Sequence, residues 1–293
     1  MQRLITILRL SRPIYLLLAA LTYVLGSGIA RYLGRPPIPV AFWFGLVGVC
    51  LAQMSMNLLA EVFRPGNEPI IPGESITERK SVRDAALNVS FGALAAEAAI
   101  VFLLYRDTRL PPPALFFFGL SLLTVIVYAV PPLRLFDKGF GEFLISIHVA
   151  YLIPSIAFLL QYGNYHKLMT VVALPLTLLA VAIFLTLDFA SFSDDIKYER
   201  STLLSRLGWE RAVPLHHGLV ILSYILFGAG PLLGFSLALL WPAFLTLPFG
   251  LLQIYFLRNI ALGAKPLWTL LTANAFALFG LTAYFLTLAF WLR

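Results

Sequence analysis

Nine long apolar stretches dominate the chain, and short segments rich in proline, glycine and charged residues separate them. A helix needs roughly 20 apolar residues to cross the hydrocarbon core of a membrane. The pattern therefore predicts an all-α integral membrane protein with about nine transmembrane helices in a bundle. The predicted spans are residues 14–30, 40–59, 85–105, 114–130, 143–161, 169–187, 212–232, 237–257 and 267–292.

No polar stretch is long enough to form a separate soluble domain. We therefore expect one transmembrane domain over residues 1–293, with an N-terminal half 1–142 and a C-terminal half 143–293. The two longest polar stretches follow the second and the sixth predicted spans, so both fall on the same side of the membrane.

Composition and charge agree with this interpretation. The chain is 60% hydrophobic and 12% charged, whereas a soluble domain carries about 25% charged residues. Its net charge of +7 does not indicate nucleic-acid binding, because the basic residues lie in short loops between apolar stretches. With a cytoplasmic N-terminus, most of the 21 lysines and arginines fall on the cytoplasmic side. We expect a protein integral to the cell membrane, with its N-terminus and its polar site loops in the cytoplasm.

Carboxylates gather where the sixth apolar stretch ends, in residues 187–208, which read LDFASFSDDIKYERSTLLSRLG. Asp188, Ser191 and Asp195 share one face if the helix continues, while Asp194 points elsewhere. An acidic residue at membrane depth is costly and more often functional than structural. The alternative for the charged run that begins at Asp194 is a solvated loop.

A second polar cluster follows the second apolar stretch, in residues 57–73, which read NLLAEVFRPGNEPIIPG. Asn57 and Glu61 are four residues apart and share a helix face, and Arg64 follows within one turn. Oxygen ligands from two helix ends, with basic residues nearby, suit a divalent cation that holds phosphate groups. Mg²⁺ commonly takes one or two carboxylates together with phosphate oxygens and water. Alternatively, Asn57 is a polar helix end and Glu61 forms an interfacial ion pair with Arg64.

A third polar segment, residues 128–142, reads YAVPPLRLFDKGFGE and joins two spans on the same predicted side. Its double proline favours an extended exit from the helix, and Gly139 and Gly141 permit a tight re-entry. Arg134 and Lys138 could reach a phosphate group, although a basic inside loop would have the same composition.

These motifs, together with the start RLSRP and about nine spans, resemble the UbiA superfamily of intramembrane prenyltransferases over nearly the whole chain. The family's first motif is of the type NDxxDxxxD. Asn57 matches its asparagine and Glu61 its middle aspartate. Leu58 replaces the first aspartate and Pro65 stands where the last would be, so this motif is degenerate. The segment EPIIPGESIT resembles the loop that follows it.

The second and third motifs match the family pattern more closely. In the second, DxxDxxxD, Asp188 and Asp195 match the outer aspartates and Ser191 replaces the middle one. TLLSRLG at 202–208 fits the TLxxRLG signature in register. Residues 128–142 match the family loop Y-S-x-P-P…G-x-G-E.

The resemblance implies a helical bundle with a central cavity open to lipid, in which two Mg²⁺ ions bridge an allylic diphosphate to the two acidic motifs. It implies catalytic roles for Asp188, Asp195 and Glu61. The implied metal ligands are Asn57, Glu61, Asp188, Asp194 and Asp195. The implied diphosphate-binding residues are Asn57, Arg64, Arg134, Lys138 and Arg200.

We therefore expect a Mg²⁺-dependent prenyltransferase that moves an isoprenyl group from an allylic diphosphate to a lipophilic acceptor, such as an aromatic quinone precursor, within the membrane lipid. Two alternatives stay open. A terpene cyclase would use the same fold and the same diphosphate chemistry. A non-catalytic lipid- or pigment-binding subunit of a membrane complex would account for the degenerate first motif.

Overall fold

The computed structural model describes residues 2–65, 68–71, 73–107 and 109–293, and its regular secondary structure is helical throughout these ranges. Nine segments of the described chain are long and apolar enough to cross a membrane, which confirms the predicted class and span count. Three residues of the first predicted motif region, Gly66, Asn67 and Pro72, lie outside the described residues.

The nine spans each correspond to one predicted apolar stretch. They are α2 Pro13–Tyr32, α3 Pro39–Val62, α4 Ile76–Arg106, α5 Pro112–Ala129, α6–α7 Gly141–Tyr162, α8 Lys167–Lys197, α10 Trp209–Gly228, α11–α12 Leu237–Ala261 and α13 Trp268–Trp291. Shorter elements lie before, between or within them: α1 Gln2–Leu10, η1 Leu135–Asp137, the π-helical η2 His148–Leu152 between α6 and α7, α9 Leu203–Leu207, η3 Gly230–Leu233 and η4 Trp241–Thr246.

Local sequence signals explain where several spans begin. Pro13, Pro39 and Pro112 each stand in the first turn of a helix, where the missing N–H is not needed and the fixed φ suits a helix. Ser75 and Glu78 form a capping box at the start of α4, in which each side chain accepts a hydrogen bond from the other's backbone N–H.

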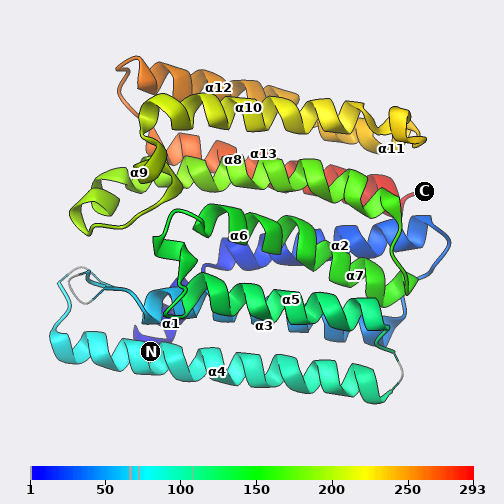
Figure 1. Cartoon of the computed structure of the whole chain (residues 1–293), viewed down its shortest axis with the longest axis horizontal. Helices are drawn as coiled ribbons and strands as arrows, with labels where there is room; N and C mark the ends of the chain where they lie inside the picture. Colours follow the sequence, from blue (N-terminus) through cyan, green and yellow to red (C-terminus); the bar gives the residue numbers. More distant parts are fainter. Residues whose placement is uncertain (1, 66–67, 72, 108) are drawn as a thin grey trace.

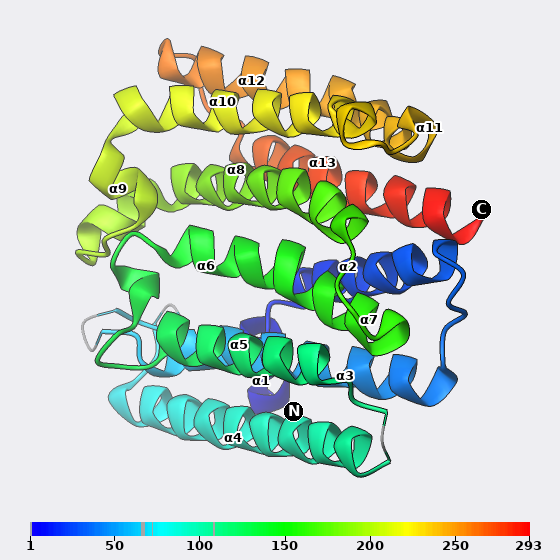
Figure 2. The same cartoon turned by 45° about the vertical axis from the view of Figure 1, so that its right-hand side comes forward.

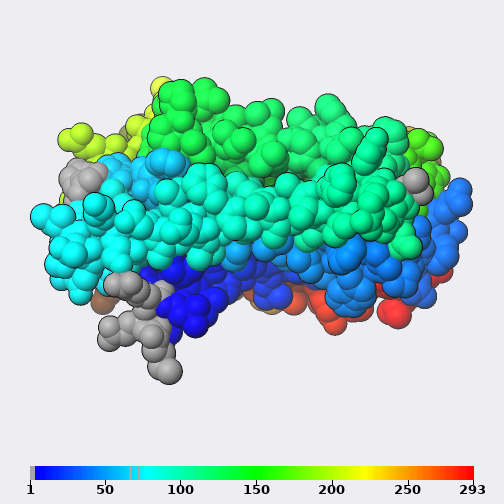
Figure 3. All heavy atoms as spheres, turned by 90° about the horizontal axis from the view of Figure 1, so that it is seen from below, coloured from blue at the N-terminus to red at the C-terminus, as the bar shows by residue number. Residues whose placement is uncertain are grey.

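The spans lie roughly side by side, with α4 at one edge of the molecule and α10 and α12 at the other (Figures 1 and 2). Seen from below, α4 runs along the whole length of one face (Figure 3). The last span, α13, packs against both α2 and α8. Trp291 Nε1 donates a hydrogen bond to the carbonyl of Val24 at 3.0 Å. The first and last spans are therefore neighbours, so the two halves of the chain enclose a shared interior.

The boundary between the predicted halves, after residue 142, falls in the first turn of α6, which begins at Gly141. The helices on the two sides of this boundary pack against each other extensively, as α2 does with α7 and α13. The division into halves stays a prediction.

Two spans extend nine or ten residues beyond one end of their predicted apolar stretches. Helix α8 continues to Lys197, ten residues beyond the predicted end at 187, because its next turn is anchored: Phe189 is buried and packs on Trp209 with ring centroids 4.6 Å apart. Helix α4 begins at Ile76, nine residues before the predicted start at 85, where the capping box supports two polar turns. Hydropathy alone does not mark such helical extensions into the polar region.

Candidate active site

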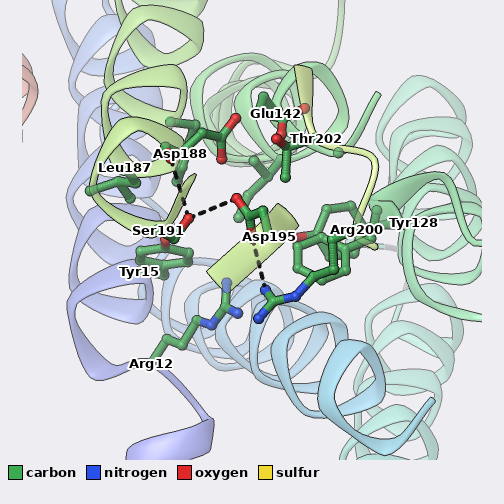
Figure 4. A pocket seen from close by; sticks show the side chains of 14 residues that line it. Arg12, Tyr15, Tyr128, Glu142, Leu187, Asp188, Ser191, Asp195, Arg200 and Thr202 are labelled. Carbon is green, nitrogen blue, oxygen red and sulfur yellow. Dashed lines mark hydrogen bonds and ion pairs between the residues drawn. The ribbon is translucent and has the colours of Figure 1, made fainter. Parts of the chain in front are cut away.

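A cavity of about 220 Å³ lies between the N-terminal and C-terminal helices, at the end of the bundle where α8 leads towards α9 (Figure 4). Its charged lining consists of Arg12, Glu142, Asp188, Asp195 and Arg200. These residues come from the link between α1 and α2, the start of α6, the last turns of α8 and the segment after α8. Positions far apart in the sequence therefore meet at one polar cavity.

Helix α8 supplies the acidic wall. Asp188, Ser191 and Asp195 all line the cavity because α8 stays helical through them, as the spacing predicted. Ser191 Oγ donates a hydrogen bond to Asp195 Oδ2 at 3.0 Å. Asp194, a metal ligand that the family resemblance implied, is exposed and does not line this cavity. The structure therefore brings Asp188, Ser191 and Asp195 of α8 to the cavity and leaves Asp194 outside its lining.

Glu142 adds a third carboxylate, which was not among the predicted site residues. It is buried at the start of α6, and its Oε1 accepts a hydrogen bond from the backbone N–H of Leu203 at 3.2 Å. Thr202, beside it in the cavity wall, caps the short helix α9 by accepting from Ser205 N at 3.2 Å. The TLLSRLG segment is thus held next to the acidic wall. Glu142 is the last residue of the G-x-G-E motif, so the motif contained the signal.

Arg12 and Arg200 face the carboxylates across the cavity (Figure 4). Arg200 Nη1 lies 3.5 Å from Asp195 Oδ1. The Arg12 guanidinium lies over the ring of Tyr15, 5.4 Å from its centroid. Burial acts to lower the pKa of Arg12, but interactions with Tyr15 and Glu61 outweigh it and raise this pKa above the usual value. Arg12 is therefore a permanently charged residue in the cavity wall. In the sequence, only its place in RLSRP pointed to a role in the site.

Strained backbone accompanies this basic wall. Arg12, Arg134 and Glu199 have φ values of 50°, 33° and 56°, in the left-handed region that non-glycine residues rarely adopt. All three stand at this end of the bundle, in the segments that lead to or adjoin the cavity. Such strain persists only where surrounding contacts impose it, and it concentrates at functional sites.

Glu61 lies outside the cavity lining and is held by arginines. Its Oε1 accepts from Arg12 Nη2 at 2.9 Å, its Oε2 accepts from Arg64, and its exposed fraction is 4%. Arg64 also pairs with Glu68 at 2.8 Å, and Glu68 in turn pairs with Arg200. Burial raises the pKa of Glu68, although Arg64 and Arg200 act in the opposite direction. The ion pair that was the alternative interpretation of Glu61 is present, within a larger network of alternating charges.

Asn57 belongs to a buried hydrogen-bond network. Its Nδ2 donates to the carbonyl of Ser11 at 2.8 Å, and its Oδ1 accepts from Gln53 Nε2 at 3.0 Å. Gln53 Oε1 lies 2.9 Å from His148 Nδ1, and His148 Nε2 lies 2.8 Å from Ser121 Oγ. Both ends of the Asn57 amide are therefore engaged within the protein. Asn57 holds the backbone that leads into α2, and the structure does not bring it to the carboxylates of α8.

The two basic residues predicted on the 128–142 segment also lie outside the cavity lining. Arg134 is buried, pairs with Asp137 at 2.6 Å and reaches the carbonyl of Ala60 at 3.4 Å. Lys138 is exposed, and its Nζ donates to the carbonyl of Pro132 at 3.0 Å. This segment contributes Phe136 and Glu142 to the cavity instead.

The acidic wall has the donor chemistry for a divalent cation. Within the described ranges, no three His, Cys, Asp or Glu side chains are arranged to hold a metal ion by themselves. However, Asp188 Oδ2 and Glu142 Oε2 are buried without a hydrogen-bond partner among the described residues. Mg²⁺ at phosphate sites needs only one or two carboxylates, with phosphate and water completing its coordination. The residues present fit such an ion on the α8 side of the cavity.

The curated proteins that resemble this chain include two plant homogentisate prenyltransferases. No protein-family model matches the chain. The chloroplastic homogentisate solanesyltransferase of Arabidopsis thaliana is 32% identical over 111 residues, which cover 33% of this chain and 27% of that protein. The probable homogentisate phytyltransferase 2 of Oryza sativa subsp. japonica is 28% identical over 220 residues, which cover 67% of this chain and 54% of that protein. The matched regions thus span about half the length of these relatives or less.

Solved structures match over nearly the whole chain. A UbiA homologue from Archaeoglobus fulgidus superposes with a TM-score of 0.65 at 16% identity, covering 98% of this chain and 100% of that one. Another structure, of a UbiA homologue from the same organism bound to GPP and Mg²⁺, has a TM-score of 0.55 at 17% identity. The match covers 96% of this chain and 99% of that one. The resemblance that the motifs indicated is confirmed: the chain has the fold of the UbiA superfamily.

Proposed function

We propose that this protein is an intramembrane prenyltransferase that moves an isoprenyl group from an allylic diphosphate to a lipophilic aromatic acceptor. The observation that carries the proposal is the cavity in which the carboxylates of Asp188, Asp195 and Glu142 face Arg12 and Arg200. Structures of a UbiA homologue with the same fold have been determined with GPP and Mg²⁺ and with DMAPP and Mg²⁺ bound. The names of the two plant relatives support an aromatic acceptor of the homogentisate type.

In this proposal the two walls of the cavity share the diphosphate. Asp188, Asp195 and Glu142 would hold Mg²⁺, which when bound supplies positive charge against the departing diphosphate. On the opposite wall, Arg12 and Arg200 contact the diphosphate oxygens directly. Arginine suits this role because its planar donors match phosphate geometry and it stays charged when buried. Arg64 lies one ion pair behind them, through Glu61 and Glu68.

The reaction then follows from charge and shielding. The bond between the allylic carbon and the diphosphate oxygen breaks, and the electron pair leaves with the diphosphate. Preorganised cationic groups stabilise the charge that develops there. The rings of Tyr15, Tyr128 and Phe184 line the cavity and offer faces that stabilise a carbocation. A carbon of the acceptor ring bonds to the allylic carbon, and the acceptor loses a proton.

A non-catalytic lipid- or pigment-binding subunit is the second candidate. The contacts of the first motif favour it, because Asn57 and Glu61 are engaged by the protein itself. Under that reading the cavity would bind a lipophilic molecule without any requirement for Mg²⁺ or diphosphate. A terpene cyclase would share the binding requirements of a transferase and differ in its product.

Metal-dependent binding distinguishes these candidates. We expect the purified full chain in detergent to bind inorganic pyrophosphate with Mg²⁺ and to lose at least ~10-fold in affinity, about 1.4 kcal/mol, when EDTA removes the metal. Asp188→Asn should cause a similar loss, because it removes a carboxylate from the acidic wall. The control Asp84→Asn, at an exposed position on α4, should bind as the wild type does.

Product analysis completes the test. A labelled allylic diphosphate supplied with a homogentisate-type acceptor should yield a prenylated ring. A cyclised hydrocarbon made without an acceptor would replace the transferase by a cyclase. Pyrophosphate binding that ignores both Mg²⁺ and Asp188→Asn would refute the enzyme proposal and support the binding subunit.

A further inference from the structure

A second cavity, of about 820 Å³, lies at the opposite end of the bundle from the candidate active site. Its walls come from the α2–α3 link, the end of α4, the start of α5 and the end of α7. These elements connect the spans on the side away from Asp188, so the cavity opens where the helices leave the membrane. The proposed prenyl transfer does not use it.

Hydrogen-bond donors dominate the polar lining of this cavity. Arg35, Arg106 and Arg109 all line it. Arg106 pairs with Asp107 at 3.1 Å. The side chains of Arg35 and Arg109 make no ion pair or hydrogen bond with another described residue, and Arg109 is half-buried. Arg35 is exposed. A guanidinium that is partly withdrawn from water without a counter-charge, as that of Arg109 is, is costly. Both arginines present unpaired positive charge to the same space.

A buried amide supplies the second, independent observation. Gln161 lines the cavity and is 7% exposed. Its Oε1 accepts a hydrogen bond from the backbone N–H of Ile38 at 2.7 Å, which fixes the amide orientation. Its Nε2 is buried and has no acceptor among the described residues. Leaving such a donor unpaired in the interior is costly, and an acceptor placed in the cavity would recover that free energy.

The rest of the lining is mostly apolar. Ile38, Leu110, Pro111 and Leu160 line the same cavity, and Tyr105 beside them is 63% exposed. Tyrosines are enriched at the level of lipid headgroups, and arginine donors bind phosphate oxygens in paired geometry. A ligand that satisfies both parts of the lining has a phosphate group attached to an apolar chain.

We propose that this cavity binds the phosphate group of an anionic phospholipid, with Arg35, Arg109 and Gln161 Nε2 as donors and the acyl chains lying on the apolar lining. The shared chemistry is the phosphate, which a lipid headgroup or free inorganic phosphate could supply. The apolar lining and the position at the membrane surface favour the lipid. This site does not rest on the prenyl-transfer proposal, because it lies at the end of the bundle opposite the candidate active site.

Native mass spectrometry of the full chain in a neutral detergent tests the proposal. With dioleoyl phosphatidylglycerol added, the wild type should retain one tightly bound lipid, and dioleoyl phosphatidylcholine should be retained at least several-fold less. The double variant Arg35→Gln/Arg109→Gln should lower the affinity for phosphatidylglycerol at least ~10-fold, about 1.4 kcal/mol. Gln161→Glu keeps the oxygen that accepts from the Ile38 N–H but removes the Nε2 donor, and it should lower the affinity several-fold.

The matched control is Arg31→Gln/Arg293→Gln, which removes the same charge from the same end of the bundle outside this cavity. It should retain the lipid as the wild type does. Equal loss in both double variants, or no loss in Arg35→Gln/Arg109→Gln, would overturn the site. If inorganic phosphate displaces the lipid from the wild type and itself depends on Arg35 and Arg109, the anion site stands and free phosphate is a source of its ligand. Thermal unfolding without lipid checks that all variants fold.

Discussion

At the scale of single residues, arginines line the cavity where the family pattern predicts a second set of carboxylates. The first acidic motif has no acidic residue at two of its three aspartate positions, and Glu61, which stands at the third, is paired with Arg12 and Arg64. In the proposed function, the charge on this wall that would meet a diphosphate is therefore positive without a metal. We infer a leaner site, in which cation binding belongs to α8 and Glu142, and direct anion binding belongs to Arg12 and Arg200.

Arg12→Lys tests this inference at one side chain. A lysine keeps the charge but loses the planar fork that holds Glu61 and could hold phosphate oxygens. We expect Mg²⁺-dependent pyrophosphate affinity to fall about 10-fold, or about 1.4 kcal/mol, as measured by isothermal titration calorimetry. Arg9→Lys, at an exposed position on α1, is the control and should not change the affinity. Unchanged binding in Arg12→Lys would remove Arg12 from the site.

At the scale of elements, close helix packing and one irregular helix place the site. The span predicted at 143–161 is not a continuous α-helix, because the π-helical η2 interrupts it just before Pro154. Such π segments are rare and frequent at functional sites. Here the π segment contains His148, which anchors the hydrogen-bond network of Asn57. Next to it, Gly26 of α2 lies against the carbonyl of Pro154, so α2 and α7 approach closely.

Gly26→Ala should disrupt this approach. A Cβ added at Gly26 would lie 2.0 Å from the Pro154 carbonyl oxygen, which is backbone and cannot move aside cheaply. Small residues permit such close packing of membrane helices. We expect the substitution to destabilise the protein by about 1–3 kcal/mol, seen as a lower unfolding midpoint in detergent. Gly92→Ala, where a Cβ meets no atom within 4 Å among the described residues, should leave the midpoint unchanged or higher.

At the scale of the whole molecule, the two polar cavities lie at opposite ends of the same spans. We infer from the distribution of lysines and arginines that the end with the candidate active site faces the cytoplasm. The end with Arg35 and Arg109 then faces the other side. The charge network from Glu61 through Glu68 to Arg200 joins the two halves of the chain at the active-site end.

Cysteine accessibility tests the orientation. Cys50 is the only cysteine, so a Cys50→Ser background can carry single probes at the exposed positions Lys197 and Arg31. Lys197→Cys should react with a membrane-impermeant maleimide only in inverted vesicles, and Arg31→Cys only in intact cells. The reverse pattern would place the active-site end outside. Labelling in denaturant controls for expression of each variant.

The sequence alone determined the class, the span count and the face that α8 turns towards the site. These depend on hydrophobic length and helical periodicity, which are local properties of the chain. The helical spacing therefore correctly predicted that Asp188, Ser191 and Asp195 lie together, and Glu142 and Arg12 belong to motifs that the sequence shows.

Only the tertiary structure decided which partners these residues meet. Glu61 and Asn57 match the family pattern, but distant residues, Arg12 and the Ser11 carbonyl, occupy their polar atoms. The second cavity forms where the α2–α3 link, the end of α4, the start of α5 and the end of α7 pack together. Contacts between segments that are distant in the sequence leave no periodic signal in a single sequence.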